Sequence, residues 1–563
     1  MLGKAQPTHN QPPTRKAAAA SLALTFTVAT ALFLLHLSLE TPNYPATLAN
    51  VCPFEQPNLS QPIFHSTRPR LFKALESVLA AGEILVIPSA PRILQAESDS
   101  EYMGWKQTAN VKYLLDHYSV GGGVVTISRA NDLTLNSPCL VSLYLPIQTE
   151  RDDIFMGSLP SKEELRRDFG IDNVSTVDEL PLHLSTAVKE SKNVISTVQA
   201  TQVFASLPAT VVDRLTAEGV EIQFSSQALQ AFYEARFIKT DQEFARLVFA
   251  SKLAHWVHKN VELYISRSKE VTEIEIFTEF IRLSALCGGD LQSYPPIVGA
   301  GMHGATLHYR TGNLRRESHA KIQPGSFVLV DAAPEFAGYT SDLTRTYVRG
   351  GSGKRGGLLC RGQCRLWTPQ MKEVYGIVER VQQRFIDSFE LGADWAAINS
   401  EFVVDITREL VNAEFIIGVS LEDAVQMKAY SIFMPHGLGH PVGLEVHDPT
   451  PNIFVEEGIK FLGNTSAGFD TVNAHMEWIK KQKPQLHNAA VANYKISRGH
   501  ITTVEPGIYF IPKLLESVKK EARGECINWD KIEQGGYLSL GGVRIEDIVM
   551  FGHDGKKRII TRE

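Results

Sequence analysis

The sequence is poor in features that mark several protein classes. Only six of its 563 residues are cysteine, and no two are spaced as a Cys-x-x-Cys pair. This excludes a disulfide-rich scaffold and a cysteine-based zinc module. There is also no surplus of basic residues, because 56 Lys and Arg stand against 62 Asp and Glu for a net charge of −6. The balance argues against a nucleic-acid-binding protein, which usually presents a basic face.

The overall composition is that of a folded, largely water-facing chain. Hydrophobic residues make up 44% of the sequence and charged residues 21%, which excludes a mainly disordered chain and a protein that crosses the membrane many times. At about 150 residues per domain, the length indicates two to four domains. We find no internal repeat that would indicate a solenoid or a propeller.

One hydrophobic run stands near the N-terminus. Residues 17–39 contain no Asp, Glu, Lys or Arg, whereas Lys4, Arg15 and Lys16 precede the run and Glu40 follows it. A run close to about 20 apolar residues can span a bilayer as a helix. The positive flank predicts a cytoplasmic tail, with the rest of the chain in the lumen or outside the cell.

Two alternatives to a transmembrane helix remain open for this run. It could be a cleaved signal peptide, since residues 47–49 (Thr-Leu-Ala) resemble a cleavage site, or a buried helix of the globular fold. Glycosylation sequons at Asn58, Asn173 and Asn464 agree with the secretory pathway, although such triplets are common by chance. We therefore expect a single-pass anchored protein with a lumenal or extracellular catalytic domain, or a secreted protein if the run is cleaved.

The remaining chain divides into two unequal parts with α/β (α+β) character. After the N-terminal segment (1–40) and a Pro- and Asn-rich linker (41–66), we predict a smaller α/β domain (67–235) and a larger catalytic domain (236–563). Apolar spacing predicts helices at 70–81 and 227–266 and strands at 83–88, 124–128 and 139–145. Residues 349–365 are rich in Gly and Arg and include Cys360 and Cys364. They predict a flexible surface insertion or a gene-model artefact.

Two aspartates are the first candidate metal ligands. Asp331 ends an apolar strand, and Asp342 lies in the strand that returns after a turn at Gly338. A hairpin of this length can bring both carboxylates to one face, where they repel each other unless a cation lies between them. The alternative is a pair of unrelated aspartates in a turn and on the surface.

Three histidines lie close together farther along the chain. His436, His440 and His447 occur among glycines, in a chain with only 17 histidines. Glycine lets the backbone approach a ligand, and neutral imidazole is a good ligand for borderline divalent metals. The alternative is one buried histidine with satisfied hydrogen bonds and two on the surface.

Two glutamates interrupt apolar strands near the C-terminus. Glu505 precedes Pro506, and Glu546 follows Arg544 at the spacing that places both side chains on one face of a strand. A buried carboxylate is costly unless it is paired or coordinated. The alternatives are a partly exposed strand end for Glu505 and an edge-strand salt bridge for the other pair. Taken together, the clusters supply four carboxylates and one imidazole, a set that suits two divalent ions with bridging carboxylates.

Five strings carry a family resemblance and run in order between residues 293 and 549. The strings SYPPIVGAGMHGATLHY, VLVDAAPEFAGYTSDLTRTY, FMPHGLGHPVGLEVHD, TVEPGIYF and GGVRIEDIV resemble the metallopeptidase family that includes aminopeptidase P, prolidase and methionine aminopeptidase. The resemblance implies a C-terminal pita-bread catalytic domain. Residues 155–157 and 161–168 look like the extra N-terminal domain of the proline-specific branch.

The resemblance also assigns roles to individual residues. It implies two divalent ions, usually Mn²⁺, although Zn²⁺ or Co²⁺ also suit such donors. Asp331 would hold one ion, Asp342 and Glu546 would bridge both, and His440 and Glu505 would complete the second. His308, His436 and His447 would contact the substrate or the transition state, and Arg544 would help to order them. Glu505 would also move protons for a metal-bridged hydroxide that attacks the bond before proline.

The activity implied by the resemblance is that of an Xaa-Pro aminopeptidase acting on Xaa-Pro peptides. Prolidase, an Xaa-Pro dipeptidase, is the near alternative, but the run at 487–494 has no arginine for a free proline carboxylate, and Lys495 and Arg498 are the nearest cations. A non-catalytic peptide-binding module and a dinuclear phosphohydrolase are more distant alternatives. Members of the family often dimerise, so a homodimer is also implied.

Overall fold

The computed structural model describes most of the chain after residue 51. The described residues are 52–59, 62–91, 105–116, 118, 120–129, 139–191, 194–198, 207–312, 316–350, 366–451 and 494–562. The predicted membrane or signal segment, Asn464 and residues 351–365 lie outside them. The chain divides into two compact units, Met1–Glu55 and Gln56–Glu563, and the helices and strands given below all belong to the second.

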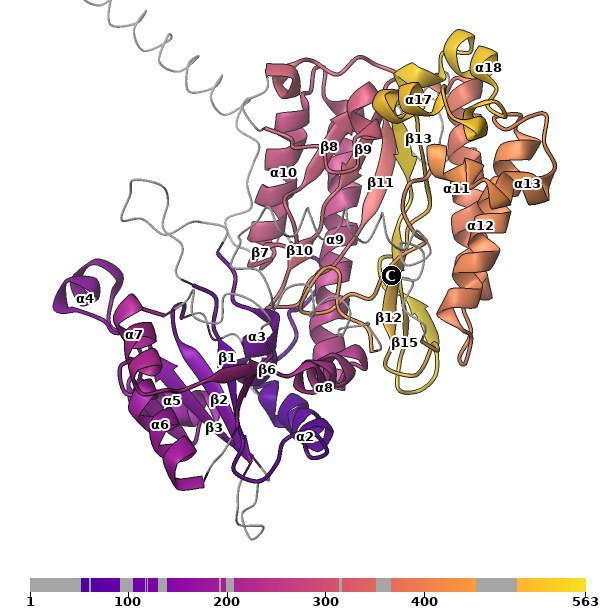
Figure 1. The fold of residues 1–563 in the computed structure, drawn as a ribbon. Helices are drawn as coiled ribbons and strands as arrows, with labels where there is room; N and C mark the ends of the chain where they lie inside the picture. Colours follow the sequence, from indigo (N-terminus) through magenta and orange to yellow (C-terminus); the bar gives the residue numbers. More distant parts are fainter. Residues whose placement is uncertain are drawn as a thin grey trace, which may run out of the picture. The chain divides into compact units, whose positions relative to one another are not determined.

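A six-stranded sheet forms the centre of the N-terminal domain (Figure 1). Its order is β4-β3-β2-β1-β5-β6, with antiparallel pairing from β1 to β3 and parallel pairing of β4, β5 and β6 to their neighbours. The three strands predicted from the sequence are confirmed as β1, β2 and β3. The bounds are β1 Ile84–Pro88, β2 Val124–Arg129, β3 Cys139–Leu145, β4 Asn173–Thr176, β5 Ile195–Thr197 and β6 Ile222–Phe224.

The helix predicted at 70–81 is displaced toward the N-terminus. Helix α2 covers Phe64–Leu75, so it begins inside the predicted linker. Phe64, Thr67 and Leu71 are all buried on one face, and this apolar stripe sets the register of the helix. The other helices that the structure describes in this domain are α3 Ala109–Leu115, α4 Glu150–Met156, α5 Lys162–Phe169, α6 Leu180–Ser191 and α7 Ala209–Ala217.

The long helix predicted at 227–266 is two helices. Helix α8 (Ser226–Phe237) ends where Ile238 becomes extended, and α9 (Asp241–Arg267) begins after Thr240. The Thr240 hydroxyl accepts a hydrogen bond from the Glu243 N–H, and the Glu243 carboxylate accepts one from the Thr240 N–H. This capping box stops the helix pattern and restarts it. Apolar periodicity alone continues through the break and does not detect it.

The described part of the larger domain contains four small sheets between helices. The sheet orders are β10-β7, β11-β9-β8, β12-β15-β16 and β13-β14. The strands are β7 Leu291–Gln292, β8 Ile297–Ala300, β9 Phe327–Asp331, β10 Pro334–Glu335, β11 Thr344–Val348, β12 Ile501–Val504, β13 Gly507–Tyr509, β14 Gly542–Arg544, β15 Asp547–Phe551 and β16 Lys557–Ile559. Among the described residues, the helices after α9 are α10 Glu273–Leu286, α11 Pro369–Ser388, α12 Trp395–Asn412, α13 Leu421–Gln426, α17 Pro512–Val518 and α18 Trp529–Gln534.

The helices of this domain contact different strands (Figure 1). Helices α9 and α10 contact β11 and β8, whereas α11 contacts β12, β13 and β14. Strand β14 also contacts β9 and β11, so the ends of strands far apart in sequence meet in the middle. The side chains at the ends of these short strands therefore lie close together, and the candidate site is formed by them.

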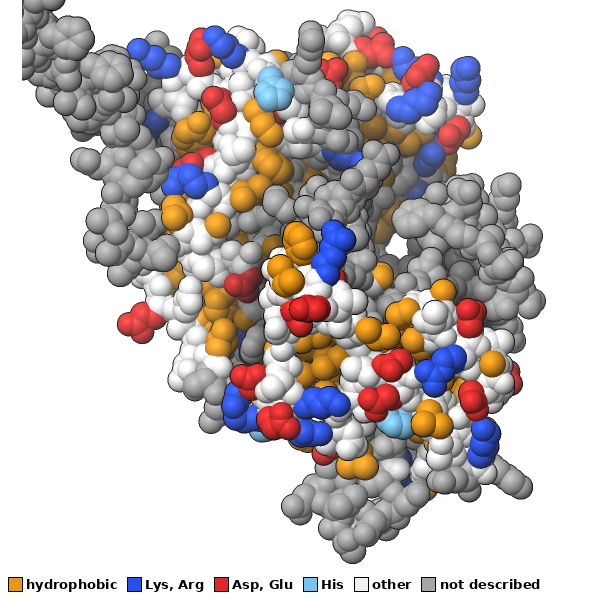
Figure 2. All heavy atoms as spheres, turned by 90° about the vertical axis from the view of Figure 1, so that its left-hand side faces the viewer, with side chains coloured by type: hydrophobic (Ala, Val, Ile, Leu, Met, Phe, Trp, Pro, Cys, Tyr) orange, Lys and Arg blue, Asp and Glu red, His pale blue; other side chains and the backbone are white. Residues whose placement is uncertain are grey.

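Two observations concern the surface. Figure 2 shows acidic, basic and hydrophobic side chains intermingled on the face drawn there, without a broad expanse of one charge sign among the described residues. Within the described ranges, no helix combines the length and the apolar character that crossing a bilayer requires.

The prediction that residues 349–365 form a surface insertion is wrong for the first of them, Arg349. Arg349 is buried, and its guanidinium donates to the carbonyls of Ile265 at 2.9 Å, Ser268 at 2.6 Å and Lys269 at 2.9 Å. The Gly- and Arg-rich composition of the segment gives no sign that Arg349 hydrogen-bonds the backbone carbonyls at the C-terminal end of α9.

Candidate metal centre

Asp331 and Asp342 lie together at the base of the β9–β11 hairpin. Asp331 is the last residue of β9 and is paired with Thr344, two residues after Asp342. The Tyr294 hydroxyl is 2.6 Å from one oxygen of each carboxylate. A single hydroxyl has one proton to donate, so the two carboxylates compete for it. The hairpin predicted from the sequence therefore brings both acidic groups to one point.

His440 is fixed by the backbone of β12. Its N–H donates to the Thr503 hydroxyl at 3.0 Å, and its carbonyl accepts the Thr503 N–H at 2.9 Å. The ring Nδ1 is 3.1 Å from the Pro441 carbonyl, which assigns the proton to Nδ1. Nε2 is then free to act as a ligand, and it lies 3.5 Å from Asp342 and 3.4 Å from Glu505.

Glu546 and Arg544 share one hydroxyl. Thr344 donates to Glu546 Oε2 at 2.7 Å and accepts from Arg544 Nε at 2.9 Å. Arg544 also pairs with Asp331. The other Glu546 oxygen, Oε1, is buried and has no hydrogen-bond partner among the described residues. An unpaired buried carboxylate oxygen is costly, so this atom calls for a ligand that the protein itself does not supply.

The electrostatics of the cluster point to a cation. Burial, followed by the charges of Asp331 and Glu505, raises the pKa of Asp342 well above its ordinary value. Burial and the neighbouring carboxylates likewise raise the pKa of Glu505 and Glu546. Buried like charges destabilise one another, and a divalent ion among them removes the repulsion.

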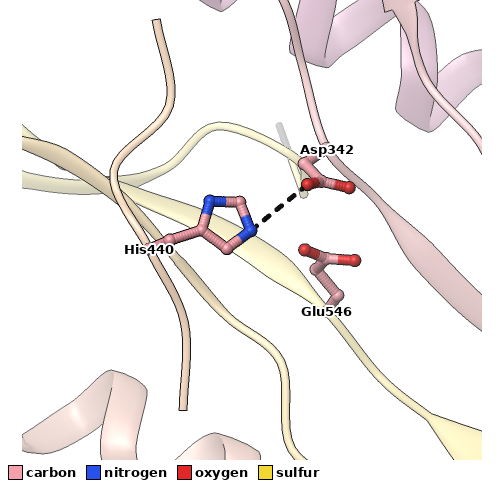
Figure 3. A group of neighbouring side chains, drawn as sticks. All are labelled: Asp342, His440 and Glu546. Atoms are coloured by element: carbon pink, nitrogen blue, oxygen red, sulfur yellow. Dashed lines mark ion pairs between the residues drawn. The ribbon is translucent and has the colours of Figure 1, made fainter. Parts of the chain in front are cut away.

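Three of the predicted ligands face one another across a small gap (Figure 3). Ligand atoms of Asp342, His440 and Glu546 all lie within 4.8 Å of one another. Glu505 joins the group through His440, and Asp331 joins it through Tyr294. The structure therefore brings together all five residues that the sequence indicated as ligands, and their donor set fits divalent ions.

Two of the predicted substrate histidines lie beside this cluster, and the third, His308, interacts electrostatically with both of them. His436 Nε2 is 2.9 Å from the Tyr509 hydroxyl, which accepts from Arg544 Nη1 at 2.9 Å. Burial, Arg544 and His308 lower the pKa of His436 to about 3. His447 is exposed, and its ring centroid is 4.0 Å from that of His440. Although the residue as a whole is exposed, its ring is partly desolvated by neighbouring atoms, and this desolvation together with His308 lowers the pKa of His447 as well. His308 itself is exposed and acts electrostatically on both rings.

Sequence reasoning missed three hydroxyl residues that organise the site. Tyr294, Thr344 and Tyr509 each hydrogen-bond at least one of the predicted site residues. All three stand inside the motif strings, but a hydroxyl is neither a metal ligand of the expected type nor a charge out of place. Of the two cations nearest to the arginine-free run, Arg498 donates to the His553 carbonyl at 3.3 Å, and the backbone of Lys495 forms an isolated antiparallel β-bridge with Asp394.

Two families match the chain. The family described as "Metallopeptidase family M24" matches residues 245–552, and the one described as "Aminopeptidase P, N-terminal domain" matches residues 64–196. The domain boundaries at residues 66 and 235 stay predictions.

Curated relatives match over most of their length. A probable Xaa-Pro aminopeptidase of Metarhizium robertsii is 28% identical over 432 residues, which cover 74% of this chain and 77% of that protein. A probable Xaa-Pro aminopeptidase of Coccidioides posadasii is 26% identical over 498 residues, which cover 87% of this chain and 92% of that protein.

Solved structures share the fold. Proline aminopeptidase P II from Yersinia pestis has a TM-score of 0.64 at 20% identity and covers 88% of this chain and 96% of its own. Zn-substituted E. coli aminopeptidase P in complex with product has a TM-score of 0.64 at 19% identity, covering 90% and 96%. The expectation of a two-domain α/β fold with a smaller N-terminal domain is confirmed.

Proposed function

Because the chain belongs to metallopeptidase family M24, we propose that it is a metal-dependent Xaa-Pro aminopeptidase that releases the residue before proline from the N-terminus of a peptide. The observation that carries the proposal is the meeting of Asp342, His440 and Glu546 within 4.8 Å, with Asp331 and Glu505 beside them. The curated relatives named above are probable Xaa-Pro aminopeptidases, and residues 64–196 match the N-terminal domain of aminopeptidase P.

The five ligand residues would hold two divalent ions. Asp331 would bind one ion, His440 and Glu505 the other, and Asp342 and Glu546 both. Two atoms support this assignment: Glu546 Oε1, which has no hydrogen-bond partner among the described residues, and Nε2 of His440, whose ring carries its proton on Nδ1. Carboxylate-rich sites of this kind suit Mn²⁺, and they also bind Zn²⁺ or Co²⁺. When bound, the ions would activate water and polarise the substrate carbonyl.

The protein's own groups would handle protons and charge. Glu505 is placed beside His440 and can accept a proton and return it to the leaving nitrogen. His436 and His447 lie beside the cluster. Together with His308 they would hydrogen-bond the substrate carbonyl or the oxygen that becomes negative in the transition state. Arg544 is held by Thr344 and Tyr509 and fixes Asp331.

Proline explains why a dedicated site is needed. The nitrogen of an Xaa-Pro bond carries no N–H, so a peptidase that recognises its substrate through that N–H loses one contact. The leaving group is a secondary amine, which must gain a proton as the bond breaks. A site that supplies this proton and accepts the ring is therefore selective for this bond.

Two peptides test the activity and separate it from its alternatives. The purified, metal-loaded protein is incubated with an Xaa-Pro-Yaa tripeptide and an Xaa-Pro dipeptide, and the products are separated by chromatography. Release of the first residue of the tripeptide is the expected result. Cleavage of the dipeptide alone would mean prolidase. Metal binding without turnover of either peptide would mean a binding module.

We also propose that the protein enters the secretory pathway, with membrane attachment through residues 17–39 unless the run is cleaved. The charge asymmetry around that run supports the proposal. So does Cys287, which is disulfide-bonded, because disulfides persist in oxidising compartments. The sequon residues Asn58 and Asn173 are exposed. Glycosidase-sensitive mass and protection from protease in sealed microsomes are expected, and digestion of an unglycosylated protein from outside would contradict the proposal. The homodimer stays a prediction from the family resemblance.

A further inference from the structure

A buried ion cluster lies next to the candidate substrate residue His447. Asp448 Oδ1 is 2.7 Å from Arg236 Nη2, and Asp448 Oδ2 is 2.8 Å from Lys239 Nζ. All three side chains are between 1% and 3% exposed. Arg236 lies in the last turn of α8, and Lys239 lies in the break before α9. Buried charges are costly unless they are paired, so the helix break and the loop with His447 are held to each other.

The Asp448 carboxylate also shapes the loop around it. Its Oδ1 accepts the Glu445 N–H at 3.3 Å, and the Asp448 N–H donates to the Pro441 carbonyl at 3.0 Å. A Cβ atom at Gly443 would lie 2.4 Å from Asp448 Oδ2, which explains the glycine. Burial alone would raise the pKa of Asp448, but Lys239 and Arg236 hold it below its ordinary value.

The two histidines of this loop are fastened separately. His440 is bound to β12 through both hydrogen bonds with Thr503. His447 is exposed and immediately precedes Asp448. Loss of the Asp448 contacts would therefore displace His447 while leaving His440 hydrogen-bonded to β12.

We infer that Asp448, paired with Arg236 and Lys239, is a positioning residue that holds His447 against the substrate. The inference rests on the proposed peptidase function and assigns Asp448 no contact with the substrate or the metal. Its effect is exerted through one neighbour, which makes it measurable as an energetic coupling.

A double-mutant cycle tests the coupling. Asp448→Asn, His447→Ala and the double variant are assayed for kcat, KM and bound metal with the Xaa-Pro-Yaa tripeptide. We expect each single change to lower kcat by about 100-fold, because small misplacements at a reacting centre have effects of that size. The kcat of the double variant should be no lower than the kcat of His447→Ala alone. The amount of bound metal should stay the same in Asp448→Asn because His440 keeps its hydrogen bonds to Thr503.

Two further variants guard against a purely structural effect. Arg236→Lys keeps the charge but not the fork that reaches both Asp448 and Asn110, and it replaces Asp448→Asn in the cycle if that variant does not fold. Arg68→Lys changes another buried arginine, which donates to carbonyls of Leu114, Phe169 and Gly170 in the N-terminal domain. It should lower Tm and leave kcat unchanged.

The possible failures can be told apart. The positioning role would be overturned if the fold-losses in kcat of the two single variants multiplied in the double variant. It would also be overturned if both Asp448→Asn and Arg236→Lys kept the full wild-type kcat. In either case the wild-type protein would remain an active peptidase. A metal-loaded wild-type protein without activity on the tripeptide would instead overturn the proposed function and, with it, this inference.

Discussion

At the scale of single residues, the site depends on hydroxyl groups as much as on charged ones. Tyr294 serves two carboxylates, and Thr344 connects Glu546 with Arg544. The carboxylates and histidines could be predicted from the sequence because each interrupts an apolar or glycine-rich context. The hydroxyls could not, because Tyr and Thr are ordinary strand residues and their partners lie 35 to 202 positions away in the chain.

Tyr294→Phe should weaken the metal centre. The change removes the donor to Asp331 and Asp342 and keeps the ring, so we expect metal affinity or activity to fall by about 10- to 100-fold, as for other outer-sphere partners of metal ligands. Metal titration followed by calorimetry measures the change. Tyr113→Phe is the matched control, since this buried tyrosine donates to the Ala235 carbonyl. Equal metal affinity in Tyr294→Phe and wild type would contradict the role.

At the scale of elements, helix and strand types were easier to predict than their limits. Strands β1 to β3 lie where the apolar runs placed them, since a short run bounded by turn residues has few other solutions. The division of α8 from α9 depends on the reciprocal hydrogen bonds of Thr240 and Glu243. The early start of α2 depends on which face packs inward. The break between α8 and α9 and the start of α2 both depend on contacts in the folded chain, which the spacing of apolar residues in the sequence does not show.

Arg349→Met should destabilise the protein without disabling it. The buried guanidinium satisfies three carbonyls around the C-terminal end of α9, so their loss should lower the free energy of unfolding by about 2–3 kcal/mol. Urea denaturation measures the change, and kcat should stay near the wild-type value. The exposed Arg167→Met provides a control that should remain within about 0.5 kcal/mol. Equal stability of the two variants would show that Arg349 is not an anchor.

At the scale of the whole molecule, the sequence predicted the two-part α/β organisation but not the order of the strands. Pairing of β12 with β15 joins residues near 501 and 550, and β14 contacts β9 and β11 across about 200 residues. Such pairings follow from packing between distant segments. His258 is part of this packing, because its Nε2 lies 2.9 Å from the Ala332 carbonyl and its Nδ1 lies 2.9 Å from the Tyr347 hydroxyl.

Acid should destabilise the fold partly through His258. Burial lowers the pKa of His258 to about 3, whereas an unfolded histidine titrates near about 6.5. The unfolded state therefore binds more protons between these values, and stability falls as pH falls below about 6.5. Between pH 6 and 4, with EDTA present, His258→Gln should reduce the slope of unfolding free energy against pH by up to about 1.4 kcal/mol per pH unit. Identical slopes would show that His258 does not carry this effect.

The central claim is that Asp342 lies between divalent ions. The most direct test is the metal content of purified wild-type protein and Asp342→Ala, measured by inductively coupled plasma mass spectrometry beside circular dichroism and the tripeptide assay. We predict about two divalent ions per wild-type chain, on the principle that bridging carboxylates hold paired ions, and loss of both metal and turnover in a folded Asp342→Ala protein. Normal metal content and normal turnover in the pure variant would contradict the account.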